Sequence, residues 1–182
     1  MTETFEIRTA RLRLRHWREE DFEPLAAMNA DPRVMEFFPT TVSREETRAR
    51  FERVRVRDVE RGYGFWPVEV IGGAPFIGMV GLGDPDFRAH FMPAVEIGWR
   101  LAAEHWGRGY ATEAARAALA YGFERLGLAE IVSFTTANNA RSRRVMEKLG
   151  MRWSPDDDFL HPLLPEGHPL RPHVLYRLRR PG

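Results

Sequence analysis

The sequence predicts a mixed α/β (α+β) fold, with a mostly antiparallel sheet of about six or seven strands flanked by about four helices. Its 182 residues suit one domain and contain no repeat, low-complexity tract or linker, so we expect a single domain over 1–182. Two β-rich runs joined by a short glycine connection indicate an antiparallel hairpin. Strands in the first half give way to a strand–helix–strand–helix order, which favours a mixed sheet.

The first third of the chain predicts one strand and two helices. Leu12 and Leu14 alternate with arginines in "RLRLRHW", the period of a strand with one buried face. Residues 18–32 begin with several acidic residues, have apolar residues at helical intervals and end at a proline. This pattern indicates a helix. Residues 44–61 predict a second helix, and its many charges indicate a solvated face.

Three strands are predicted next. "GFWPVEVI" (64–71) and "PFIGMVGLG" (75–83) form the hairpin across "GGA". "AVEIGWRLA" (94–102) follows as a further strand. Side chains alternate along a strand, so Ile97 is expected on one face and Glu96 on the other.

The last third of the chain predicts alternating helices and strands. A helix over about 110–125 has a face of small residues that allows close packing on a sheet. A β-branched strand (130–136) and a helix ending at a glycine (139–150) follow. Two more strands are expected at 151–153 and 173–179, with an irregular, proline-rich segment between them.

Composition narrows the classes of function. The chain holds 27 basic and 26 acidic residues, a formal net charge of +1, so no long-range field favours nucleic acid or an anionic membrane. An RNA-binding domain built on arginine is therefore disfavoured. The absence of cysteine excludes disulfides, thiolate zinc sites and a cysteine nucleophile. No signal-peptide pattern and no run of 18 apolar residues is present, so we expect a cytoplasmic protein.

The stretch "HWGRGYATEA" (105–114) places Gly107 and Gly109 between a predicted strand and a predicted helix. In this arrangement backbone N–H groups converge on an anion with the help of the helix dipole, which predicts a phosphate or pyrophosphate site. The alternative is a turn that merely needs positive φ. A P-loop would need Gly-Lys-Ser/Thr, and a Rossmann loop would need Gly or Ala where Thr112 stands, so neither nucleotide fold fits.

Four fragments occur in a specific order: "TARLRLR", "VEIGWRL", "WGRGYATEA" and "NNARSRRVMEKLGM". With them the chain resembles, over nearly its whole length, the GNAT acyltransferases and within these the RimJ/RimL-like branch. The resemblance implies a GNAT fold with a central pair of splayed strands. It also implies an N-acetyltransferase that moves the acetyl group of acetyl-CoA directly to a primary amine.

The resemblance also implies how coenzyme A binds. The family's pyrophosphate loop, Gln/Arg-x-x-Gly-x-Gly/Ala, falls on residues 106–111, and Trp106 departs from the Gln/Arg position. The pantetheine arm is expected to pair with the strand before the loop, at Ile97, Gly98 and Trp99. Arg108 either adds charge to a phosphate or is simply solvated. The amides expected at the pyrophosphate are those of Gly107, Arg108, Gly109, Tyr110, Ala111 and Thr112.

Acyl transfer to an amine needs a neutral nucleophile, yet α-amines and lysine amines are mostly protonated at neutral pH. A general base is therefore useful, and Glu96 is the first candidate, acting through a water. The alternative role for Glu96 is a structural ion pair. The oxyanion needs a preorganised donor, which the family takes from this strand's backbone, around Ile97 or Gly98.

A thiolate leaves easily, so a protein acid is helpful but not obligatory. Many GNAT enzymes place a tyrosine in the helix at 139–150, and this chain has none there. We assign Ser142 to the thioester sulfur, and Asn139 to a hydrogen bond with the pantetheine or the acceptor. Helix capping is the alternative for both residues.

The acceptor is less well defined by the sequence: it is either a small molecule or a protein N-terminal α-amine. Three aspartates at 156–158 either attract a cationic amine or form a solvated turn, and the histidines lack metal-site spacing, so no metal is expected. The competing function is a non-catalytic acyl-CoA-binding sensor, and a homodimer is an option. The aromatics expected either to line an acceptor pocket or to join the core are Phe37, Phe38, Trp66 and Phe87.

Overall fold

The structure is a computed structural model that describes residues 5–182, without the side chains of residues 57–59. Its helices are α1 (Phe22–Ala30), α2 (Arg44–Arg61), α3 (Tyr110–Glu124) and α4 (Ala140–Lys148). Its strands are β1 (Glu6–Arg8), β2 (Leu12–Arg15), β3 (Phe65–Val70), β4 (Gly78–Gly83), β5 (Glu96–Leu101), β6 (Glu130–Thr136), β7 (Arg152–Trp153), β8 (Phe159–Leu160) and β9 (Pro172–Arg179).

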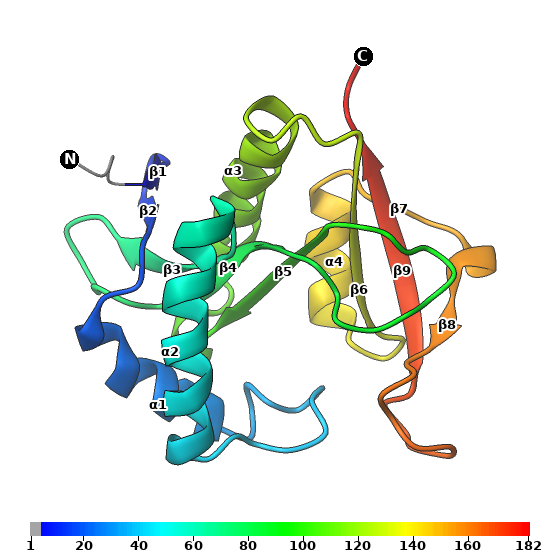
Figure 1. The fold of residues 1–182 in the computed structure, drawn as a ribbon, viewed down its shortest axis with the longest axis horizontal. Helices are drawn as coiled ribbons and strands as arrows, with labels where there is room; N and C mark the ends of the chain where they lie inside the picture. Colours follow the sequence, from blue (N-terminus) through cyan, green and yellow to red (C-terminus); the bar gives the residue numbers. More distant parts are fainter. Residues whose placement is uncertain (1–4) are drawn as a thin grey trace.

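These strands form one sheet in the order β1-β2-β3-β4-β5-β6-β9-β7, with β8 paired to β9, which runs from left to right across Figure 1. The mixed, mostly antiparallel sheet and the four helices are confirmed. The described chain has nine strands where six or seven were predicted. The extra two, β1 and β8, are three and two residues long, too short to show a period, and β8 lies in the segment predicted to be irregular.

One face of the sheet is covered by α3, whose small residues permit close packing. Ala114, Ala115 and Ala118 are fully buried in one cluster with Leu12 and Leu14 of β2. The helices α1 and α2 pack on each other around a second cluster of aromatic residues that includes Phe22 and Phe51. Within the described residues, no helix has the length and apolar character needed to cross a membrane.

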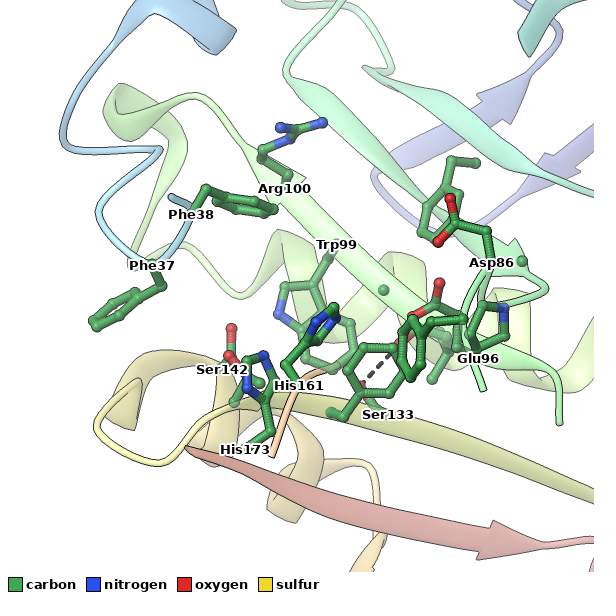
Figure 2. Close-up of a pocket in the computed structure, with 18 of the residues that line it drawn as sticks. Phe37, Phe38, Asp86, Glu96, Trp99, Arg100, Ser133, Ser142, His161 and His173 are labelled. Carbon is green, nitrogen blue, oxygen red and sulfur yellow. Dashed lines mark hydrogen bonds between the residues drawn. The ribbon is translucent and has the colours of Figure 1, made fainter. Parts of the chain in front are cut away.

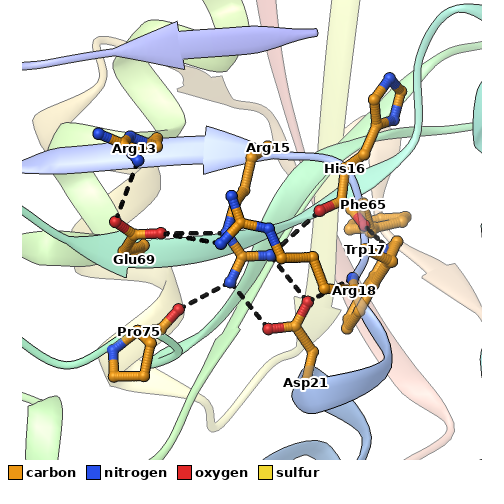
Figure 3. Close-up of polar contacts among 9 residues, drawn as sticks. All are labelled: Arg13, Arg15, His16, Trp17, Arg18, Asp21, Phe65, Glu69 and Pro75. Atoms are coloured by element: carbon orange, nitrogen blue, oxygen red, sulfur yellow. Dashed lines mark hydrogen bonds and ion pairs between the residues drawn. The ribbon is translucent and has the colours of Figure 1, made fainter. Parts of the chain in front are cut away.

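An ion-pair network ties β2 to its neighbours (Figure 3). The alternation in "RLRLR" predicted one buried face with Leu12 and Leu14, but Arg15 on the other face is also only 4% exposed. All five of its N–H donors are used: two on Asp21 at 2.8 Å each, one on Glu69 at 3.1 Å, and two on the carbonyls of His16 and Pro75. The Arg15 guanidinium can be buried because each of its N–H donors has a hydrogen-bond acceptor.

The feature that positions the site is the divergence of β5 and β6. These parallel strands pair at one point, Glu96 opposite Val132, where the Val132 N–H donates to the Val95 carbonyl at 3.0 Å. Beyond that point the two strands separate, as Figure 1 shows. The carboxyl end of β5 leads into α3 and that of β6 into α4, so one edge of β5 and two helix N-termini face the same opening.

Candidate active site

Two cavities meet at the open edge of β5. The large cavity has a volume of about 660 Å³ and contains Glu96 in its wall. The small cavity has a volume of about 350 Å³ and is bordered by the glycine loop and α4. Phe38, Trp99, Arg100 and Ser142 line both. A molecule in one cavity can therefore reach a molecule in the other beside Trp99 and Ser142.

The glycine loop supplies a row of free backbone donors to the small cavity. The N–H groups of residues 107–112 have no hydrogen-bond acceptor among the described residues, and the first helical bond runs from Glu113 N–H to Gly109 O at 3.0 Å. Gly107 and Gly109 have φ values of 74° and 79°, the left-handed conformation that favours glycine. Unpaired N–H groups at a helix N-terminus suit a phosphate, as the sequence predicted.

The loop is braced from the first strands. Glu113 accepts hydrogen bonds from the Arg11 side chain at 2.7 Å and from the Thr9 hydroxyl at 2.7 Å. The Arg11 guanidinium also donates to the Arg108 carbonyl at 3.1 Å. The Arg108 side chain itself is exposed and does not border the small cavity, so the solvated alternative fits it better. Trp106, in the family's Gln/Arg position, ties the loop to β5 by donating to the Leu101 carbonyl at 2.8 Å.

The face of α4 adds positive charge to the small cavity. Arg141, Arg144 and Lys148 border it; the last two have no ion-pair partner among the described side chains, whereas Arg141 pairs with Glu36. These residues were not predicted from the sequence. They are spaced three and then four residues apart, which places them on one face of a helix. This spacing could have predicted a positively charged face of α4.

Hydrogen bonding along β5 decides which backbone donors remain free. Residues 96, 98 and 100 face β4, whereas the carbonyl of Ile97 faces β6 and accepts the Ser133 hydroxyl at 2.9 Å. The bridge between Glu96 and Val132 also uses the Ile97 N–H, by the pattern of parallel pairs. The first β5 N–H without a strand partner is therefore that of Trp99. The N–H groups of Ile97 and Gly98, where an oxyanion donor was expected, are engaged in strand pairing, so Trp99 is the β5 residue whose N–H is available to a ligand.

Gly98 also has a role in the packing of β5. A Cβ at this position would lie 2.9 Å from the Phe65 ring, closer than real side-chain contacts allow. Its missing side chain lets Phe65 pack against β5 beside the large cavity, which both residues line. Gly98 therefore shapes the wall between Glu96 and Arg100.

Glu96 points into the large cavity from the β5 end nearest Asp86 (Figure 2). Its carboxylate makes no hydrogen bond or ion pair with any described residue, so the structural ion pair weighed as its alternative role is not found. Burial raises the pKa of Glu96 from 4.5 to about 7, and repulsion by Asp86 and Asp84 adds to the effect. A carboxyl group with this pKa can accept a proton at neutral pH.

Asn139 caps α4. Its side-chain oxygen accepts the Ser142 N–H at 3.2 Å, and its amide donates to the Thr135 hydroxyl at 2.9 Å and to the Ser142 Oγ at 3.2 Å. These contacts occupy the amide, so the capping alternative fits Asn139. Ser142 Oγ accepts one bond, and its hydroxyl hydrogen has no acceptor among the described residues. This hydrogen is free to point into the junction of the two cavities.

Aromatic side chains form part of the wall of the large cavity. Phe37, Phe38 and Phe87 line it as expected, but Trp66 is 1% exposed in the core and does not. Figure 2 shows two histidines facing the cavity, His161 and His173, with ring centroids 4.9 Å apart. Burial lowers the pKa of His161, and lowers that of His173 to about 4, so both rings are uncharged at neutral pH.

The three aspartates at 156–158 line neither cavity. Asp157 pairs with Arg177 at 2.8 Å and with His90 at 3.6 Å, so it is a structural partner of β9. Of the residues that the structure describes, no three His, Cys, Asp or Glu side chains are grouped to hold a metal ion.

Comparison with known proteins connects this geometry to a family. Residues 11–152 match the model of the acetyltransferase (GNAT) domain. The uncharacterized N-acetyltransferase YnaD of Bacillus subtilis is 31% identical over 163 residues, 89% of each protein. A GNAT-family acetyltransferase from Bacillus anthracis superposes with a TM-score of 0.79 at 28% identity, covering 96% of this chain and 98% of the other. The fold is also that of a ribosomal-protein-S5-alanine acetyltransferase from Vibrio fischeri, with a TM-score of 0.75, 17% identity and 96% coverage of both chains.

Proposed function

The chain belongs to the GNAT family of acetyltransferases, which use acetyl-CoA, and from this premise we propose that it acetylates a primary amine held in the large cavity, with Glu96 as general base. One observation carries the proposal. A carboxylate with no partner among the described residues and a row of six free backbone N–H groups border two cavities that join beside Trp99 and Ser142.

Binding of acetyl-CoA is supported by the donors around the small cavity. The amides of residues 107–112 suit the pyrophosphate, and Arg144 and Lys148 suit a further phosphate. With the phosphates there, the pantetheine arm can run along the open edge of β5 past Trp99, which places the thioester at the junction with the large cavity. The cosubstrate supplies the activated acetyl group.

The residues at the junction divide the chemistry between them. Glu96 takes the proton that the amine must lose, directly or through a water. The Trp99 N–H stabilises negative charge that develops on the carbonyl oxygen. The Ser142 hydroxyl donates a hydrogen bond to the departing sulfur. Transfer is direct in this proposal: the amine attacks the thioester carbonyl, the CoA thiolate leaves, and no acyl-enzyme forms.

The test measures thiol release from acetyl-CoA by the purified protein in the presence of polyamines, amino acids, aminoglycosides and ribosomal-protein N-terminal peptides. Glu96→Gln is measured beside the wild type, and calorimetry follows CoA binding. Turnover on one class of amine that collapses in Glu96→Gln supports the enzyme and the base together. Tight CoA binding without acetylation of any amine would favour a sensor or regulatory module.

A further inference from the structure

Arg100 is a partly buried cation with no anion beside it among the described residues. It lies on β5, on the same side as Glu96, and lines both cavities. It makes no ion pair with any described carboxylate, and its Nε is buried without a hydrogen-bond partner. Its contacts are the Met35 sulfur, 3.3 Å from Nη1, and the Phe38 ring, whose centroid lies 5.1 Å from Cζ. Neither contact neutralises a charge, so the fold leaves the cost of burying this guanidinium uncompensated.

A second arginine faces the same space. Arg50 of α2 lines the large cavity and has no ion pair among the described residues; Glu46, one helical turn away, stays beyond ion-pair distance. Burial and repulsion by Arg50 lower the pKa of Arg100 to about 10, so Arg100 remains charged at neutral pH. Two guanidinium groups that repel each other across a cavity form a site for an anion.

The opposite end of the cavity is negative. Asp86 and Glu96 lie there without an ion pair among the described residues, beside Asp84, whose charge is paired with Arg61. Figure 2 shows Arg100 and Glu96 toward opposite ends of β5. His161 and His173 are neutral, so they add no positive charge to the large cavity between its two ends. Four residues of a strand separate the two ends, so the Cα atoms of Glu96 and Arg100 lie about 13 Å apart.

We propose that the acceptor is a small zwitterion, whose amine binds near Glu96 and whose anionic group, a carboxylate or a phosphate, binds between Arg100 and Arg50. This inference rests on the proposed function, because it names the substrate class of that same site. The two ends of the cavity match the two charges of such a molecule. An N-terminal peptide presents an amine to the acidic end but no anion of its own backbone to the arginines.

Matched acceptors test the anionic group. The assay compares an α-amino acid with its amide, an ω-amino acid with the alkylamine of equal length, and aminoethyl phosphate with ethanolamine. The wild type is expected to prefer the anionic member of at least one pair by about tenfold or more in kcat/KM. Equal rates within every pair, or acetylation of N-terminal peptides in preference to all anionic amines, would overturn the inference while leaving the acetyltransferase standing.

Variants of the two arginines test whether they bind the anionic group of the acceptor. In Arg100→Gln, KM for the anionic acceptor should rise about tenfold or more, KM for its neutral counterpart should stay unchanged, and the Kd of acetyl-CoA should stay unchanged. Arg50→Gln should act in the same direction but less strongly, because Arg50 is exposed. Arg53→Gln, an exposed position on the same helix outside both cavities, is the matched control. A rise in the Kd of acetyl-CoA equal to the rise in acceptor KM would reassign Arg100 to the cosubstrate and refute the acceptor site.

Two further measurements keep the outcomes distinct. Arg100→Lys should recover part of the preference, and the midpoint of thermal unfolding of Arg100→Gln should not fall, because no native ion pair is lost. Calorimetric titration of the amino acid into the CoA-loaded protein reads the anion site without turnover. If the wild type binds the amino acid, Arg100→Gln does not, and no amine is acetylated, the proposed function fails and the anion site stands.

Discussion

Replacing Glu96 with glutamine tests whether its unpaired carboxylate acts as a base. The change removes a proton acceptor and preserves volume, and no described hydrogen bond or ion pair is lost with it. General bases contribute roughly 10²- to 10⁴-fold to a rate, so kcat should fall by about 10²-fold or more. The Kd of acetyl-CoA should not change, because the small cavity does not include Glu96.

The structure also sets the pH at which the base works. With a pKa of about 7, Glu96 is about 9% ionised at pH 6 and about 91% ionised at pH 8, so its contribution to kcat/KM rises about tenfold over this range. The free fraction of the acceptor amine also rises with pH. The ionisation of the amine affects the wild type and Glu96→Gln equally, so it cancels in the ratio of their kcat/KM values. The ratio should therefore rise tenfold between pH 6 and pH 8 and level off above.

The same variant should gain stability, which separates a base from a structural residue. Folding raises the pKa of Glu96, so the folded state prefers the protonated form, and the unfolding free energy falls as pH rises from 4.5 to 7. Below pH 4 the variant and the wild type should be equally stable. Above pH 7 the variant should be more stable, by at most about 3 kcal/mol, as measured by chemical denaturation. A flat rate ratio, or a variant less stable at pH 8, would contradict the assignment.

Four other variants give sharp outcomes. Ser142→Ala should lower kcat about tenfold and leave the Kd of CoA unchanged, because the Asn139 side chain still caps α4 through the Ser142 N–H after the hydroxyl is removed; a normal rate would remove Ser142 from the chemistry. Arg144→Gln and Lys148→Gln should each raise the Kd of acetyl-CoA roughly two- to fivefold at low salt, and less at high salt; calorimetry at two salt concentrations decides. Asp21→Ala should lower the unfolding free energy by about 3–5 kcal/mol, because it leaves Arg15 buried without its main partner; denaturation with unchanged kcat/KM in the folded enzyme checks this.

Regular elements and the glycine loop were predictable because each has a local signal. The alternation around Leu12, the helix from 44 to 61 and the two glycines before α3 all appear where the sequence placed them. The signal in each case is a period or a conformation that a few neighbouring residues determine. For β1 and β8 the pairing partner decides the conformation, and two or three residues carry no period of their own.

The electrostatics of the site depend on contacts between distant parts of the chain. Arg13 and Arg15 alternate in the same way with the buried leucines, but Arg15 is buried because Asp21 and Glu69 converge on it from other segments. Arg100 looked like one more arginine among many, and its lack of a partner becomes visible only when the surrounding elements are in place. The candidate base was found from its strand position, whereas its unpaired state and raised pKa needed the fold.

The contrast between paired and unpaired charges separates scaffold from site in this molecule. Arg15 makes five hydrogen bonds, and Glu113 accepts from three donors, so both stabilise the fold around the sheet and the loop. Arg100 and Glu96 are also an arginine and a glutamate, and both lie on the central strand β5. Neither has an ion-pair partner among the described residues. Leaving both unpaired lowers stability, and the two charges face one cavity from its two ends. Unpaired charges of this kind are retained where they serve function, and here a ligand would have to supply a cation for Glu96 and an anion for Arg100. A molecule that carries both an amine and an anionic group does so.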